Sequence, residues 1–200
     1  PSTRLHILPA DMPDSVSAPP TAATSNKLPF AVVVQDGSED ADALLARFAA
    51  SLRQSGRRVR GLIQPPRVPG QPRPMVVIDL DDENIRYDIS NPRGANARGC
   101  LVSPSAVADA SAVLRRARAE GADLVMVNRF GTLEASGGGL VAEMLELLSD
   151  SIPVLAVINP RYLEEWRSFT GGTGTELPPR IQALQAWFEQ WSAQRARNNG

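Results

Sequence analysis

The stretch Leu124-Val125-Met126-Val127-Asn128-Arg129-Phe130-Gly131 decides how the rest of the chain is interpreted. Its four leading apolar residues are typical of a strand that is buried on both faces. Polar residues and a glycine follow directly, so we expect the strand to end at Val127 in a loop. Open sheets of parallel strands bind ligands at the carboxyl ends of their strands. The stretch therefore predicts an α/β fold with a ligand site that begins at Asn128.

Strands and helices are expected to alternate on both sides of this stretch. Short apolar or β-branched runs predict strands, and apolar residues at helical spacing predict helices. Expected strands cover residues 30–34, 59–63, 75–80, 85–89, 124–127 and 153–158, and expected helices cover 104–120, 140–148, 162–169 and the segments around 44–52 and 181–191. The strands at 75–80 and 85–89 bracket a polar turn and predict an inserted β-hairpin. We therefore expect a three-layer α/β fold with a mostly parallel sheet.

Composition divides the chain into two parts. Residues 1–27 are rich in Pro, Ser, Ala and Thr. Such a segment buries too little apolar surface to offset its ordering entropy, so we expect a disordered tail. Residues 28–196 are expected to form a single α/β domain.

Charge and cysteine content exclude several classes of function. The formal net charge is −1, so no overall basic field recruits nucleic acid or an acidic membrane. Cys100 is the single cysteine and His6 the single histidine, which argues against a disulfide, a zinc site or a histidine-based active site. No apolar run approaches the roughly 20 residues that span a bilayer, and the first residues lack a signal-peptide layout. We expect a cytoplasmic protein that binds neither nucleic acid nor membrane.

The loop from Asn91 to Cys100 is the first candidate for anion binding. Arg93 and Arg98 supply planar donors for an oxyanion, and Gly99 lets the backbone point its amides inward. Arg98 would also favour the thiolate of Cys100, although the expected domain holds no histidine to act with it. The alternative is a connecting loop with solvated arginines and a buried cysteine.

The second candidate is the loop that follows Val127. Asn128 and Arg129 come first, then Gly131 and Glu134, and the triplet Gly137, Gly138 and Gly139 precedes the next expected helix. Glycines at the positive end of a helix allow a ligand to approach closely. The alternative is a flexible strand-to-helix connection with a surface ion pair.

Two further loops have less specific patterns. The turn at residues 35–42 has one glycine, no lysine and four acids, which suits the first turn of a helix better than a phosphate. A divalent cation or a ligand amine remains an alternative there. The loop from Thr170 to Glu176 is rich in Gly and Thr and is expected to act either as a lid over the ligand crevice or as a mobile linker.

Five short motifs carry a resemblance to a known family. The motifs are Val32-Val33-Val34, Gly61-Leu62-Ile63-Gln64, Gly94 to Cys100, Asn128-Arg129-Phe130-Gly131 with Glu134, and Thr175-Glu176-Leu177-Pro178. With them the chain resembles the bacterial domain-of-unknown-function family number 2478 over roughly residues 29–192. Members are often labelled molybdenum ABC transporter ATP-binding proteins or are encoded near molybdate-uptake genes, so the resemblance implies molybdate or tungstate as a ligand.

In layout the chain is also similar to P-loop proteins of the thermophilic nucleoside-triphosphatase type, and this implies a degenerate P-loop-like (Rossmann-like) fold. Asn128 would stand at the magnesium-binding carboxylate of that family, Arg129 at the neighbouring acid, and Glu134 at a matching carboxylate. The Gly-Lys-Ser/Thr element should lie near Asp40-Ala41-Asp42, where it is missing. Both departures remove groups needed for hydrolysis, so the transporter label is not expected to describe an ATPase.

These observations favour a non-catalytic ligand-binding or regulatory protein. Its ligand would be a small oxyanion, molybdate or tungstate, or a nucleotide-like anion, and no catalytic residue, metal site or identified cofactor is expected. The predicted ligand-binding residues are Arg93, Arg98, Gly99, Cys100, Asn128, Arg129, Gly131, Glu134, Gly137, Gly138 and Gly139.

Two alternatives from other classes stay open. One is a divergent magnesium-dependent nucleoside-triphosphatase or phosphotransferase, with Asp36, Asp40, Asp42 or Glu134 on the metal. The other is a protein-interaction module. Its apolar C-terminal helix would form a homodimer or dock on a transporter or metalloenzyme.

Overall fold

The computed structural model describes residues 27–91 and 102–198. Within them, strands form one sheet in the order β4-β3-β2-β5-β6-β1-β7. β2, β5, β6, β1 and β7 run parallel, whereas β3 is antiparallel to β2 and to β4. The strands are β1 (Phe30–Val34), β2 (Val59–Ile63), β3 (Val76–Asp79), β4 (Arg86–Asp88), β5 (Leu124–Phe130), β6 (Val154–Ile158) and β7 (Thr175–Leu177). The mostly parallel sheet and the inserted hairpin are therefore confirmed.

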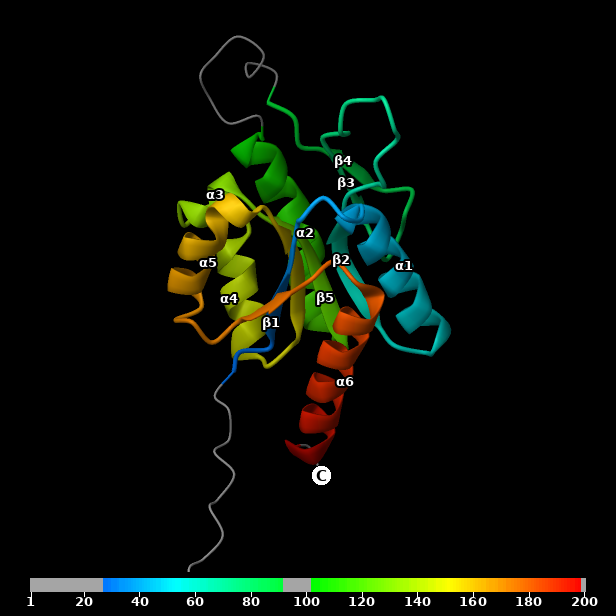
Figure 1. Cartoon of the computed structure of the whole chain (residues 1–200), viewed down its shortest axis with the longest axis vertical. Helices are drawn as coiled ribbons and strands as arrows, with labels where there is room; N and C mark the ends of the chain where they lie inside the picture. Colours follow the sequence, from blue (N-terminus) through cyan, green and yellow to red (C-terminus); the bar gives the residue numbers. More distant parts are fainter. Residues whose placement is uncertain (1–26, 92–101, 199–200) are drawn as a thin grey trace, which may run out of the picture.

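Helices cover both faces of the sheet, as Figure 1 shows, with α3, α4 and α5 on one side and α1 and α6 on the other. Alternate side chains of the central strands enter two separate apolar clusters, one beneath each set of helices, which is the predicted three-layer arrangement. The helices are α1 (Ala41–Gln54), α2 (Pro104–Glu120), α3 (Thr132–Ala135), α4 (Val141–Ser149), α5 (Leu163–Phe169) and α6 (Ile181–Asn198), with a 3-10 turn η1 (Pro160–Tyr162) before α5. Helix α2 packs with α4 on the face of the sheet that α3 and α5 also cover.

An acid of the first β-α turn caps helix α1. Asp40 is the N-cap residue, and its Oδ1 accepts a hydrogen bond from the backbone N–H of Asp42 at 3.1 Å. Oδ1 of Asp36 accepts from the backbone N–H of Ser38 at 2.8 Å. The bond to Asp40 satisfies a donor that a helix start leaves free, so the capping interpretation is confirmed for Asp40. The bond to Asp36 lies within the turn that precedes the helix.

β5 does not end at Val127, as expected, but continues to Phe130 through a β-bulge. Met126 pairs with Leu155 and Arg129 with Val157, so two residues of β5 oppose one of β6 between them. The extra residue shifts by one position the alternation of β5 side chains between the two faces of the sheet. Phe130 therefore enters the core on the α2 side, and Arg129 reaches toward α1 on the opposite side. The predicted polar loop is a bulged strand.

The segment from Thr170 to Glu176 is neither a lid nor a linker. Its last residues form β7, which pairs with β1, and the backbone N–H of Leu28 donates to the carbonyl of Thr173 at 3.0 Å. Because Leu28 precedes β1, this loop lies at the amino ends of the strands. The ligand site was predicted at the opposite edge, so the lid interpretation is wrong.

The C-terminal helix packs inside the molecule. Leu184, Trp187 and Phe188 of α6 are buried in the cluster beneath α1. The rings of Phe188 and Phe48 meet edge to face, with their centroids 6.3 Å apart. This face of α6 is therefore occupied within the chain, and Ile181, Ala183 and Trp191 at its border are partly exposed.

Some expectations lie outside the described residues. They are the disordered tail, apart from Lys27, and four predicted ligand-binding residues: Arg93, Arg98, Gly99 and Cys100. Among the residues that are described, no helix is long and apolar enough to cross a membrane.

Candidate functional site

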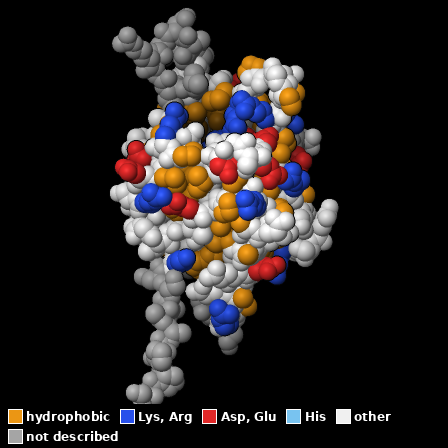
Figure 2. Space-filling model, viewed as in Figure 1, with side chains coloured by type: hydrophobic (Ala, Val, Ile, Leu, Met, Phe, Trp, Pro, Cys, Tyr) orange, Lys and Arg blue, Asp and Glu red, His pale blue; other side chains and the backbone are white. Residues whose placement is uncertain are grey.

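A cavity of about 720 Å³ opens at the carboxyl ends of β1, β2, β5 and β6. Figure 2 shows a recess with apolar side chains near the top of the molecule, flanked by basic side chains. The cavity has an apolar and a polar part. The apolar part includes Leu62, Met75, Val77, Ile89, Val107 and Ala110, and the polar part includes Gln35, Gln64, Arg73, Asn128, Arg129 and Asn159.

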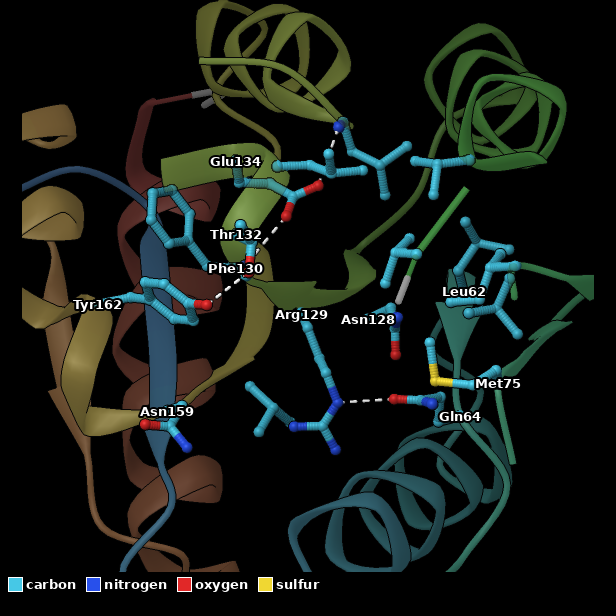
Figure 3. Close-up of a pocket in the computed structure, with 18 of the residues that line it drawn as sticks. Leu62, Gln64, Met75, Asn128, Arg129, Phe130, Thr132, Glu134, Asn159 and Tyr162 are labelled. Carbon is cyan, nitrogen blue, oxygen red and sulfur yellow. Dashed lines mark hydrogen bonds between the residues drawn. The ribbon is translucent and has the colours of Figure 1, made fainter. Parts of the chain in front are cut away.

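Arg129 is fixed at the cavity wall by two partners, of which Figure 3 shows Gln64. Its Nε donates to Oε1 of Gln64 at 2.6 Å, and its Nη2 donates to Oδ1 of Asp42 at 2.5 Å. Nε2 of Gln64 donates in turn to the carbonyl of Pro74 at 2.8 Å, which fixes the orientation of the Gln64 amide. The bulge in β5 makes this arrangement possible because it turns Arg129 toward α1.

Asp42 lies buried behind the polar part of the cavity, with 3% of its side chain exposed. Nη1 of Arg73 lies 3.0 Å from its Oδ2, as an ion pair whose geometry does not make a hydrogen bond. Burial raises the pKa of Asp42 to about 6, although the charge of Arg73 lowers it. One buried carboxyl group thus holds two of the arginines that line the cavity.

Asn128 is the extra residue of the bulge. Its φ is 64°, a left-handed conformation that asparagine adopts more readily than most residues. Its side chain lines the cavity, and Figure 3 shows it directed toward the space beside Arg129, Gln64 and Met75. Among the described residues, no hydrogen bond satisfies its amide. Asn128 therefore offers a donor and an acceptor to a ligand.

Glu134 supports the loop that follows β5. Its Oε2 accepts from the backbone N–H of Gly131 at 3.0 Å, and its Oε1 accepts from that of Leu140 at 3.1 Å. Burial raises the pKa of Glu134, whereas these backbone hydrogen bonds lower it. Both oxygens already have partners, so the carboxyl group serves the backbone more than a ligand.

A polar rim lies on the side of the cavity toward α5. The hydroxyl oxygens of Thr132 and Tyr162 are 2.5 Å apart, and Figure 3 shows the pair above Asn159. Cζ of Arg161 lies 4.6 Å from the ring centroid of Tyr162. Oδ1 of Asn159 accepts from the backbone N–H of Arg161 at 3.1 Å, which orients the start of this turn. Arg161 forms no ion pair with a described residue.

The structure brings together four of the predicted residues. Asn128, Arg129, Gly131 and Glu134 all line the cavity. The glycines at 137, 138 and 139 lie behind Glu134 and do not reach the cavity wall.

Sequence reasoning missed several side chains that complete the site. Asp42 was interpreted as part of a helix start or, in the enzyme alternative, as a metal ligand, and not as the partner of an arginine. Its spacing from Leu45 places both on the buried face of α1. Gln64 directly follows β2 and therefore lies at the predicted edge, which was a usable signal. Arg161 and Tyr162 lie in η1, shortly after the end of β6, so the same signal applied to them. Arg73 comes from a loop whose position the sequence does not specify.

Comparison with known proteins identifies the family. A model of a protein family of unknown function, DUF2478, matches residues 30–187. The chain belongs to the DUF2478 family. It is also 34% identical over 169 residues to "Molybdenum import ATP-binding protein ModC 2" of Bradyrhizobium diazoefficiens, an alignment that covers 84% of the chain and 19% of that protein. The chain thus spans about a fifth of the relative's length.

A solved structure resembles the fold. A human cancer-related nucleoside triphosphatase, solved in solution, superposes with a TM-score of 0.53 at 17% identity and covers 74% of this chain and 86% of its own. At this identity the likeness concerns the fold alone.

The turn between β1 and α1 contains no lysine, because the only lysine of the chain, Lys27, precedes β1 at the amino edge of the sheet. The described residues also hold no group of three His, Cys, Asp or Glu side chains that could bind a metal ion. The polar side chains that line the cavity include Arg73, Arg129 and Arg161 and the amides of Gln35, Gln64, Asn128 and Asn159.

Proposed function

We propose that this DUF2478 protein binds a small organic anion, of nucleotide-like chemistry, in the cavity at the carboxyl edge of its sheet and does not hydrolyse it. The observation that carries the proposal is the Asp42–Arg129 ion pair. A P-loop site places a cation on the turn before α1 and an acid at the end of the neighbouring strand. Here the carboxylate stands on α1 and the cation on β5.

This reversal disfavours the binding of a magnesium–triphosphate complex. A phosphate beside α1 would meet the carboxylates of Asp36, Glu39 and Asp40. A magnesium ion beside β5 would meet the guanidinium of Arg129 and the neutral amide of Asn128. Binding without turnover is the chemistry that this charge arrangement favours.

The size of the cavity supports an organic ligand. Small-molecule sites occupy about 300–1,000 Å³ and combine apolar walls with a few polar groups. The cavity fits this description at about 720 Å³. A bare oxyanion would leave the apolar part unfilled.

Molybdate is the second candidate, because the curated relative is named as a molybdenum import protein. Only 19% of that protein aligns with the chain, so its transport activity need not reside in this part. A regulatory role and a cytoplasmic location remain predictions. A divergent hydrolase is disfavoured because both oxygens of Glu134 are engaged by backbone amides.

Calorimetric titration tests the proposal. The full chain is titrated with a nucleoside monophosphate, with molybdate and with ATP plus magnesium, and phosphate release is assayed in parallel. We expect saturable binding of at least one anion and no release. Arg161→Ala should weaken binding about tenfold or more, since a charged hydrogen bond contributes about 1.5–3 kcal/mol.

Arg86→Ala is the matched control, because it removes an equal charge from an exposed position on β4, outside the cavity. Equal affinities for the Arg161→Ala and parent proteins would contradict the assignment of the binding site to this cavity. Magnesium-dependent phosphate release would show that the protein is an enzyme.

A further inference from the structure

We infer that the apolar part of the cavity takes a planar, purine-type ring, and that the ligand carries a single phosphate group held at the polar rim. The inference rests on the proposed function, because it specifies the ligand class of the same site. It also gives the ligand a direction, with its ring inside and its anionic end at Arg161.

The apolar side chains that a ring can reach are those with exposed surface in the cavity. Met75, which precedes β3, and Val102, which precedes α2, are partly exposed and line the cavity. Leu62 on the sheet and Ala110 on α2 form its floor, each with 1% of its surface exposed. A flat ring would lie against these apolar groups, as an isolated base stacks on apolar side chains in enzymes that hold one.

Asn128 supplies the hydrogen bonds that a base edge requires. A planar amide matches the paired donor and acceptor of a purine edge, as it does in protein–DNA contacts. The bulge holds this amide at the border between the apolar and polar parts of the cavity. Gln35, at the end of β1, is a second amide on the cavity wall.

The charges limit the ligand to one phosphate. Arg129 and Arg73 share the carboxylate of Asp42, which leaves Arg161 as the cation of the rim without an ion pair among the described residues. A phosphate monoester carries a charge of about −1.5 to −2 at neutral pH. A triphosphate would carry about twice that charge and would need a metal ion, for which the described residues offer no group of ligands.

The anion is also displaced from the position that a P-loop would give it. Of residues 35–42, only Gln35 lines the cavity. The acids of this turn face the start of α1 and would repel a phosphate there. The ligand therefore lies toward α2 and the β3–β4 hairpin, beside the position that a phosphate occupies in a P-loop protein.

Four probes test the inference on the full chain by calorimetry: adenosine 5′-monophosphate, guanosine 5′-monophosphate, ribose 5-phosphate and molybdate. We expect at least one of the nucleotides to bind tenfold or more tightly than ribose 5-phosphate. If ribose 5-phosphate or molybdate binds as tightly as both nucleotides, the ring is not recognised and the inference is wrong, while the proposed anion-binding function stands.

If neither nucleotide binds, the inference is also wrong, and the molybdate titration then decides the proposed function on its own. The two failures are therefore distinguishable.

Two variants locate the ring. Ala110→Leu should fill the apolar part and weaken nucleotide binding at least tenfold, whereas Ala108→Leu, on the exposed side of the same helix, should leave it unchanged. Asn128→Gly keeps the left-handed backbone and removes the amide, and we expect about a tenfold to hundredfold loss. Melting curves establish that each variant is folded. Unchanged nucleotide affinity in folded Asn128→Gly or Ala110→Leu would overturn the inference.

Discussion

Gly139 and Glu134 show why a glycine is required at one position of the Gly137–Gly139 triplet. Gly139 has a φ of +60°, and a Cβ there would lie 2.0 Å from Oε1 of Glu134. That oxygen accepts a hydrogen bond from the backbone N–H of Leu140. Because Gly139 has no Cβ, the buried carboxyl group of Glu134 can approach the start of α4. Gly137 also has a positive φ, but open space surrounds it. The triplet therefore contributes to the site indirectly, because Gly139 makes room for the carboxyl group of Glu134.

Gly139→Ala should therefore cost more stability than Gly137→Ala. The left-handed backbone costs an alanine about 1–2 kcal/mol at either position. Displacing the Glu134 carboxyl group at Gly139 adds about 1–3 kcal/mol for backbone donors left unpaired. Urea unfolding curves measure both losses, and Gly137→Ala serves as the control for the backbone. Equal losses would mean that Glu134 moves away without penalty.

The sequence was informative about single residues wherever chain position alone fixed their place. Asn128, Arg129 and Glu134 were assigned to the correct sheet edge because they follow a buried strand. The ion pair between Asp42 and Arg129 could not be predicted, since it depends on which face of β5 the arginine occupies. That face is set by the bulge, and no sequence pattern predicted the bulge.

At the scale of secondary-structure elements, β5 and β7 are where prediction and structure differ most. In β5 the polar residues after Val127 suggested a strand end, but the strand continues because Phe130 re-enters the core after the bulge. In β7 a run of only three residues, preceded by glycines, carried too little periodicity to be recognised. The longer strands and helices were predicted correctly because their apolar patterns are long enough to be distinctive.

Helix α6 allows a test of the interaction-module alternative. Trp187→Ala should lower the free energy of unfolding by about 3–5 kcal/mol, because it removes a large buried side chain beneath α1. Light scattering should give the same mass for the variant and the parent. Trp191→Ala, at the partly exposed border, is the control and should cost less. A parent with twice the mass of the Trp187→Ala variant would instead support a dimer through this helix.

At the scale of the whole molecule, Asp42 links the site to overall stability. Its carboxyl group contacts Arg129 of β5 and Arg73 of the segment before β3, so it connects three parts of the chain. Burial raises its pKa from 3.8 to about 6. Between these two values the folded state binds the proton more strongly than the unfolded state does. The contribution of Asp42 to stability therefore grows as the pH falls through about 6 and is complete below about 4.

The pH dependence of the free energy of unfolding should reveal the titration of Asp42. From pH 7 to pH 4 the Asp42 contribution should rise by about 3 kcal/mol, since each pKa unit corresponds to about 1.4 kcal/mol. Asp42→Asn should remove that rise, and Asp109→Asn on the exposed side of α2 should retain it. Urea midpoints at pH 4, 5, 6 and 7 provide the measurement. The carboxyl groups of Asp36 and Asp88, whose pKa values are lowered by Ser38 and Ser90, act in the opposite direction but cancel in the comparison. An unchanged slope in Asp42→Asn would contradict the assignment.

The position of β1 in the sheet has a consequence for the order in which the chain assembles. Phe30 pairs with Val154 of β6 and Ala31 with Thr175 of β7, so β1 is completed on both sides by segments that the ribosome makes much later. The hairpin of β3 and β4, by contrast, closes from neighbouring residues. During synthesis β1 must therefore wait without these two partners, and pairings of such long sequence separation form slowly. A nascent chain of this architecture cannot secure β1 until β6 and β7 have been made.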